Sequence, residues 1–306
     1  MRLIIAKPRG FCAGVDRAIR SVEQALERHG APVYVLNNIV HNAHVVEELR
    51  AKGAVFVRSM DEVPEGAYLL FSAHGVAPER WEHAERLRLQ VIDATCPLVE
   101  KVHHEARRFA AKDFTVILIG EEGHDETVGT MGWAAGHVRL VQTVEDAERL
   151  AVPDPDQVAY ITQTTLSVED CRRVIEALRR RFPAIRGPVR EDICYATSNR
   201  QAAVLALAPE ADLVLVVGDP ESANSTRLRD IARGLGRAAH LIPDAGGLRP
   251  EWLEGVETIL LTSGASVPER LVAGVVDWFK QRGSCSVEER TLVEEDVEFR
   301  LPRELS

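Results

Sequence analysis

Three cysteines in this chain have similar sequence surroundings, and together they have the clearest capacity for chemistry. Cys12, Cys96 and Cys194 lie in LIIAKPRGFCAGVDRAI, LQVIDATCPLVEKV and VREDICYATSNRQAAV, where an apolar, strand-like run gives way to a helical pattern. Loops at the carboxyl ends of strands converge in open α/β sheets, so the three thiols are expected to meet. Three thiolates make a metal site that leaves one coordination position open. The alternative is that the three cysteines are only small buried hydrophobic residues. Their spacing alone does not distinguish a metal site from this alternative.

The local sequence of Cys96 is the most specific of the three. Pro97 follows it, and proline favours the first helical position, so Cys96 is predicted to be the N-cap of the helix that includes LVEKVHHEARRF. A thiol there lies at the positive end of the helix dipole and ionises more easily. The other two cysteines are predicted to have no such role. Cys171 lies on an apolar helix face and should pack in the core, whereas Cys285 should be exposed on the surface.

Three histidines and one glutamate also follow strand-like runs. His41, His74 and His124 each come shortly after such a run, which favours a shared site, although a single loop histidine is usually a surface residue. Glu126 lies two residues beyond His124 in GHDETVGTMG. Burial would raise the pKa of this carboxyl and make Glu126 a proton donor. An ordinary exposed glutamate is the alternative.

Four further loops are rich in hydroxyl and amide side chains. They are TQTTLS (162–167), YATSN (195–199), GDPESANSTR (218–227) and TSGASVPE (262–269). Hydroxyls and backbone N–H groups at helix starts bind anions, so the candidates to hold a phosphate are Thr164, Ser222, Asn224 and Ser266. Ordinary helix capping would explain any one of these loops. The chain has no Walker loop and no G-x-G-x-x-G motif, which gives nucleotide binding little support.

Strand-like and helix-like segments alternate along the whole chain, which predicts α/β architecture with mostly parallel sheets. The expected strands are Leu3–Ala6, Val33–Leu36, Ala54–Val57, Tyr68–Ser72, Thr115–Ile119, Val138–Val141, Val158–Thr162, Leu213–Val217, Ala239–Ile242 and Thr258–Thr262. Expected helices include Asp16–His29 and Val168–Arg181, the latter capped by Ser167. The strand–cysteine–helix pattern occurs three times and favours three related α/β units, here 14–96, 97–187, and 1–13 with 188–281, followed by a tail at 282–306.

Composition and charge limit the possible partners. The 306 residues carry a net charge of −10 without a compensating basic stripe, which argues against nucleic acid. The first residues do not form a signal peptide, and no stretch approaches the ~20 apolar residues of a membrane span. Five cysteines without a Cys-x-x-Cys motif fit a reducing compartment, so the chain is expected to be cytoplasmic.

Three other functions remain open from these residues. A zinc hydrolase could use three thiolates and a water molecule. An iron–sulfur carrier or sensor would usually close its cluster with four protein ligands, which the three key cysteines do not supply. A phosphosugar isomerase would explain the hydroxyl-rich loops and leave the cysteines without a role.

Eight motifs, taken in order, resemble the 4-hydroxy-3-methylbut-2-enyl diphosphate reductases, the family that completes the non-mevalonate isoprenoid pathway. They are PRGFCAGVDRAI, VHNAHVV, FSAHGV, DATCPLVEKVH, GHDETVGTMG, TQTTLSVED, DICYATSNRQ and LTSGASVPE. The resemblance extends from Met1 to the terminal FRLPREL. It implies three α/β units arranged like a trefoil around a [4Fe–4S] cluster.

The resemblance also implies roles for individual residues. Cys12, Cys96 and Cys194 would hold the cluster and leave its fourth iron without a protein ligand. Glu126 would be the proton donor, assisted by Thr164. The diphosphate pocket would comprise His41, His74, His124, Thr164, Ser222, Asn224 and Ser266, with Thr197 beside it. This chain departs from the family at Ala223, where a serine is frequent, but the backbone N–H of Ala223 can still donate to phosphate.

The reaction that the resemblance implies is reductive dehydroxylation. The allylic C–O bond of 4-hydroxy-3-methylbut-2-enyl diphosphate would be cleaved with two electrons and two protons, giving water with isopentenyl or dimethylallyl diphosphate. The expected partners are this small diphosphate substrate and a ferredoxin- or flavodoxin-type electron donor.

Overall fold

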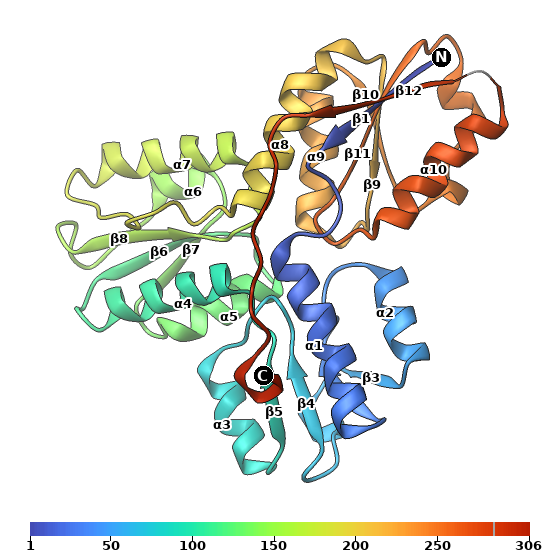
Figure 1. Cartoon of the computed structure of the whole chain (residues 1–306). Coiled ribbons are helices and arrows are strands. Elements are labelled where there is room, and N and C mark those ends of the chain that lie inside the picture. Colours follow the sequence, from blue (N-terminus) through green and yellow to red (C-terminus); the bar gives the residue numbers. More distant parts are fainter. Residues whose placement is uncertain (284) are drawn as a thin grey trace. The chain divides into compact units, whose positions relative to one another are not determined.

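A computed structural model describes residues 1–283 and 285–306 of the chain. These residues form two compact units. Unit 1 comprises Met1–Val15, His41–Val45 and Tyr195–Glu298, and unit 2 comprises Asp16–Val40, Val46–Cys194 and Phe299–Ser306. Every strand pairing in the described residues is parallel, and the strands form three sheets (Figure 1). The predicted α/β class with parallel sheets is confirmed.

Unit 1 holds a five-stranded sheet in the order β10-β9-β11-β1-β12. Its strands are β1 (Arg2–Lys7), β9 (Leu213–Val217), β10 (Ala238–Ile242), β11 (Thr258–Ser263) and β12 (Ser286–Thr291). The central strands are apolar on both faces because helices cover both. Helix α10 (Glu269–Gln281) packs on the face that includes Leu3, and helices α8 (Tyr195–Leu207) and α9 (Ala223–Gly234) pack on the face that includes Ile4.

Unit 2 holds two smaller sheets. The first, in the order β3-β2-β4-β5, comprises β2 (Val33–Leu36), β3 (Ala54–Val57), β4 (Tyr68–Phe71) and β5 (Gln90–Asp93). The second, in the order β7-β6-β8, comprises β6 (Thr115–Ile119), β7 (Val138–Val141) and β8 (Val158–Thr162). Side chains of α6 (Val144–Arg149) and α7 (Val168–Arg181) pack on one face of the second sheet, and those of α4 (Pro97–Ala110) pack on the other.

The remaining helices are α1 (Ala13–His29), α2 (Ala43–Ala51), α3 (Pro78–Arg86) and α5 (Asp125–Trp133). Each expected strand is present to within one residue at either end, and α7 has the predicted bounds with Ser167 as its N-cap. Among the helices of the described residues, none combines the length and the apolar character that crossing a membrane requires.

Helix α1 begins at Ala13, three residues before the expected Asp16, and the chain differs from expectation at two further places. Cys194 does not follow a strand, because residues 182–194 are irregular apart from one bridge between Ala159 and Arg186. Gly187 and Pro188 explain this, since proline lacks an N–H for strand pairing and both residues interrupt strands. Strand β5 confirms the strand-like run that was expected before Cys96 in LQVIDATC. The expected tail, 282–306, contributes the edge strand β12, and its Ser284 lies outside the described residues.

Strand β12 could not be recognised by hydrophobic pattern. Its sequence, SVEERT, is polar on both sides, and it pairs with β1 alone. Charged side chains are typical of exposed sheet edges, where they discourage pairing with other chains. The division of the chain into three related units stays a prediction.

Candidate active site

Each of the three key cysteines lies directly before the first residue of a helix. Cys12 precedes α1, Cys96 precedes α4 and Cys194 precedes α8. Cys96 is the N-cap of α4 with Pro97 in the first turn, as predicted. No disulfide forms among the cysteines of the described residues. A thiolate at a helix start is stabilised by the helix dipole, so all three residues are suited to bind a metal as thiolates.

Cys12 is held in unit 1 by contacts of the backbone around it. The Cys12 N–H donates to the Ala265 carbonyl at 3.1 Å. The Gly10 carbonyl accepts a hydrogen bond from Arg200 at 2.8 Å, and the Arg200 side chain is fully buried. Burial raises the pKa of the Cys12 thiol, while nearby backbone N–H groups and the Arg200 guanidinium oppose the shift. A thiol whose pKa is raised keeps its proton at neutral pH unless a metal ion displaces it.

Cys194 and Glu126 are linked in unit 2 through one residue, Thr164. The Thr164 carbonyl accepts the N–H of Cys194 at 3.1 Å. Its own N–H and hydroxyl donate to the two carboxylate oxygens of Glu126, at 2.7 Å and 2.9 Å respectively. A candidate metal ligand and a candidate proton donor are thus fixed to the same backbone position at the end of β8.

Glu126 lies in the first turn of α5 and is almost completely buried. Burial raises the pKa of its carboxyl to about 7, even though both hydrogen bonds from Thr164 favour the charged form. The carboxylates of Asp192 and Glu121 add to the increase. A carboxyl that titrates near neutral pH can hold a proton and release it, as a general acid must.

His124 caps the helix that carries Glu126. Its Nδ1 accepts the N–H of Glu126 at 3.1 Å, so Nδ1 carries no proton. The ring is therefore neutral with its proton at Nε2, where it can donate to a ligand. This tautomer follows from the capping hydrogen bond and was not visible in the sequence.

His74 lies beside His124 in the same unit. The two ring centroids are 5.8 Å apart in a T-shaped arrangement. The Nδ1 atom of His74 is 3.2 Å from the Ser72 hydroxyl and 3.9 Å from an Asp125 carboxylate oxygen. Asp125 is in turn fixed by a hydrogen bond from Asn37 at 3.2 Å. Ser72 and Asp125 were missed as supporting residues, although both lie inside the motifs FSAHGV and GHDETVGTMG.

Unit 1 contains the other predicted phosphate contacts. The Ser266 hydroxyl donates to the His41 carbonyl at 2.9 Å, which joins the loop after β11 to the start of α2. Ser222 is the N-cap of α9 and accepts from the N–H of Ser225 at 3.3 Å, so ordinary capping is part of its role. The Ser225 side chain is buried and sits so close to Gly218 and Gly264 that a side chain at either glycine would collide with it.

Asn224 is the most informative residue of this group. Its side chain is buried, yet neither its Nδ2 nor its Oδ1 has a hydrogen-bond partner among the described residues. A buried amide without partners costs free energy unless a ligand satisfies it. Asn224 therefore fits a polar ligand. Ala223 is the first residue of α9, and Thr197 is buried in the first turn of α8.

The structure gathers these residues within the two units. Unit 2 holds Cys96, Cys194, His74, His124, Glu126 and Thr164, whereas unit 1 holds Cys12, His41, Thr197, Ser222, Ala223, Asn224 and Ser266. The two other cysteines are Cys171 and Cys285. Cys171 is on the buried face of α7 and packs in the apolar core, as predicted. Cys285 is partly buried against the core of unit 1, where exposure was expected.

Comparison with known proteins identifies the family. Residues 3–280 match the family model described as LytB protein. The chain belongs to the LytB family. The match confirms the family resemblance that the eight sequence motifs indicated.

LytB relatives are similar to this chain over nearly its whole length. The 4-hydroxy-3-methylbut-2-enyl diphosphate reductase of Mycolicibacterium paratuberculosis is 55% identical, over 99% of this chain and 92% of the relative. The enzyme of the same name from Nocardia farcinica is 54% identical, over 99% of this chain and 91% of the relative. A solved structure, the E-1-hydroxy-2-methyl-but-2-enyl-4-diphosphate reductase from Plasmodium falciparum, is 36% identical with a TM-score of 0.96, covering 99% of this chain and 96% of that one.

Proposed function

We propose that this chain reduces 4-hydroxy-3-methylbut-2-enyl diphosphate to isopentenyl diphosphate and dimethylallyl diphosphate. The names of its LytB relatives support the substrate and the reductive chemistry. The observation that carries the proposal is the linkage of Glu126 to Cys194 through Thr164, because it joins a proton donor to a metal ligand. In the overall reaction, one C–O bond breaks and one C–H bond forms. Two electrons and two protons are consumed, and the oxygen leaves as water.

Cys12, Cys96 and Cys194 would hold a [4Fe–4S] cluster. Their thiols, each at the start of a helix, match the ligand chemistry of such a cluster. When bound by three cysteines, the cluster supplies single electrons and one iron with an open coordination position that can act as a Lewis acid toward the allylic hydroxyl. We expect the electrons to come from a ferredoxin- or flavodoxin-type donor.

Glu126 would supply the proton that allows the oxygen to leave as water. With a pKa of about 7, its carboxyl is protonated in a large fraction of molecules at neutral pH. Thr164 orients that carboxyl with two hydrogen bonds. The second proton goes to either end of the allyl group, which gives the two products.

The diphosphate would be held by neutral donors and histidines. His124 would donate from Nε2, because its Nδ1 is occupied by the N–H of Glu126. Asn224 would satisfy its buried amide on a phosphate oxygen, and the N–H of Ala223 would add a donor at the start of α9. The remaining proposed contacts are His41, His74, Thr164, Ser222 and Ser266, with Thr197 beside them.

An anaerobic turnover assay tests this proposal. The reconstituted chain, reduced by dithionite through a viologen mediator, is given the substrate, and the products are separated by chromatography. The proposal predicts both isopentenyl and dimethylallyl diphosphate, and it predicts that Glu126→Gln retains the cluster and loses most turnover. A cluster-loaded chain that consumes no substrate would contradict the proposal.

A further inference from the structure

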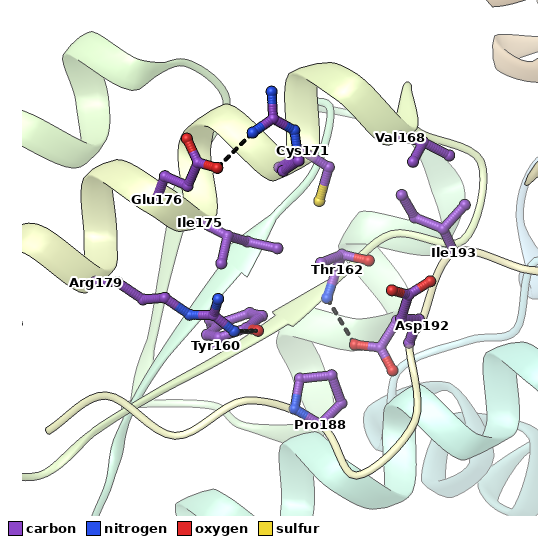
Figure 2. Close-up of a pocket in the computed structure, with 12 residues that line it drawn as sticks. Tyr160, Thr162, Val168, Cys171, Ile175, Glu176, Arg179, Pro188, Asp192 and Ile193 are labelled. Atoms are coloured by element: carbon purple, nitrogen blue, oxygen red, sulfur yellow. Dashed lines mark hydrogen bonds and ion pairs between the residues drawn. The ribbon is translucent and has the colours of Figure 1, made fainter. Parts of the chain in front are cut away.

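The segment that leads to Cys194 is not fixed by regular structure. Residues 187–194 form no helix or strand. A cavity of about 330 Å³ separates part of this segment from α7. Figure 2 shows Cys171 and Ile175 of α7 on one side of this cavity and Pro188, Asp192 and Ile193 on the other. Ile193 packs against the apolar core that includes α7, whereas Pro188 and Asp192 line the cavity.

Polar contacts of Lys101 hold the segment as well. The Lys101 ammonium is 2.6 Å from the Arg190 carbonyl, 3.1 Å from the Glu191 carbonyl and 2.8 Å from a carboxylate oxygen of Asp192. An ammonium has three N–H donors, and here three acceptors from consecutive residues surround it. A planar guanidinium could not reach the same three oxygens from one point, which favours lysine at this position.

Asp192 completes the attachment on its other side. Its side chain is fully buried, and its second carboxylate oxygen accepts the N–H of Thr162 at 2.9 Å, the contact drawn as a dashed line in Figure 2. Thr162 is the last residue of β8. The segment is thus tied both to helix α4 and to the end of strand β8, two residues before Cys194.

The helix that carries Lys101 begins at Cys96, the other candidate metal ligand of unit 2. Cys96 is the N-cap of α4, and Lys101 lies little more than one turn further along that helix. Lys101 therefore joins the element that starts at Cys96 to the segment that ends at Cys194. We propose that Lys101 is a positioning residue that sets the spacing of these two thiols for the cofactor. This role rests on the proposed function of the cysteines.

A second buried acid, Glu105, lies near the Lys101 ammonium, which therefore faces two carboxyl groups. Glu105 is also on α4, is buried, and lies beside Asp192. Without Lys101, two neighbouring carboxyl groups would remain in a site of low polarity. Lys101→Met could for that reason fail to fold. The double variant Lys101→Met with Asp192→Asn removes both charges of the ion pair. This double variant replaces Lys101→Met if the single variant does not fold.

Cluster retention tests the proposal independently of turnover. Wild type, Lys101→Met and Lys101→Arg are reconstituted anaerobically, their iron and sulfide are quantified, and the loss of visible absorbance is followed after a chelator is added. Lys112→Met is the matched control, because Lys112 is exposed just beyond the end of α4. We expect Lys101→Met to lose its cluster to the chelator at least about 10-fold faster than wild type, an effect typical of residues that orient metal ligands. The rate for Lys101→Arg should lie between those of Lys101→Met and wild type. Lys112→Met should match wild type.

Two further readouts separate positioning from a general loss of stability. The electron paramagnetic resonance line shape of the reduced cluster should change in Lys101→Met and not in Lys112→Met. Amide hydrogen exchange of residues 189–194 in the cluster-free chain should become faster in Lys101→Met and stay unchanged in Lys112→Met. Equal chelation rates and an unchanged line shape in Lys101→Met would overturn the role of Lys101. Wild type that takes up no iron and sulfide would instead overturn the proposed function, and this role with it.

Discussion

The Glu126 carboxylate receives both of its hydrogen bonds from one residue, Thr164. The backbone N–H contributes one at 2.7 Å and the hydroxyl the other at 2.9 Å. Both donors stabilise the charged form, so the pKa of about 7 is the result of burial acting against them. Any change that removes a donor should raise the pKa of Glu126 further.

Thr164→Val tests this relationship directly. The substitution keeps the backbone N–H and removes the hydroxyl, so the carboxylate loses one of its two donors. We expect the pKa of Glu126 to rise and the pH above which turnover falls to move upward. The measurement is the pH dependence of turnover by the reconstituted chain. Cluster content should stay unchanged, because the carbonyl that accepts the Cys194 N–H is retained. A pH profile identical to that of wild type would contradict the assignment.

Glu126 should also make folding stability depend on pH. Its ordinary pKa of 4.5 is raised to about 7, so between these values the folded chain holds a proton that the unfolded chain has released. Stability therefore falls as pH rises from about 4.5 to 7, by up to about 3 kcal/mol from this group. Urea unfolding of the cluster-free chain at pH 5 and pH 8 measures the effect. Glu126→Gln should lack this component, and an equal pH dependence in both proteins would show that Glu126 does not titrate as described.

Serine substitutions should separate the three cofactor cysteines from the other two. Cys12→Ser, Cys96→Ser and Cys194→Ser should each lose most bound iron and sulfide, because a hydroxyl is a poor ligand for a cluster. Cys171→Ser is the control, since Cys171 lies on the buried face of α7 and packs in the core. It should retain the cluster and lose some thermal stability. The measurement is the iron and sulfide content after anaerobic reconstitution. A Cys171→Ser chain without cluster would argue against the assignment of Cys12, Cys96 and Cys194 as the cluster ligands.

Asn224→Leu should change affinity and stability in opposite directions. The buried amide has no partner among the described residues, so an apolar side chain of similar size removes a desolvation cost. The free energy of unfolding of the cluster-free chain should stay equal or increase. Substrate affinity should fall about 10-fold, the loss of about one hydrogen bond to a charged group. Calorimetry and substrate titration measure the two effects, and lower stability with unchanged affinity would make Asn224 a structural residue.

Periodicity and capping signals predicted the fold where the local sequence is unambiguous. Continuous apolar runs located β6 and β9, and Pro97 placed Cys96 at the start of a helix. These signals did not predict the segments whose structure depends on tertiary contacts. Strand β12 is polar on both sides, and the residues before Cys194 are held by Lys101 and not by strand pairing.

The sequence motifs predicted which residues form the candidate site, but they did not predict how these residues contact one another. The order of motifs pointed to Glu126, Thr164 and Cys194, but their mutual contacts depend on how β8 and α5 meet. Neither the Nδ1 cap of His124 nor the isolated amide of Asn224 has any sequence signal. Lys101 is one of several charged residues on α4, and only its distances to three oxygens distinguish it.

The electron paramagnetic resonance spectrum of the anaerobically purified, reduced chain, recorded with and without 4-hydroxy-3-methylbut-2-enyl diphosphate, tests the central claim most directly. We predict a cluster signal that changes when the substrate is added, because the substrate hydroxyl should reach the iron without a protein ligand. A signal that is indifferent to the substrate would contradict this account and favour an electron carrier or sensor. The absence of any cluster under strict anaerobiosis would contradict it as well and favour zinc chemistry.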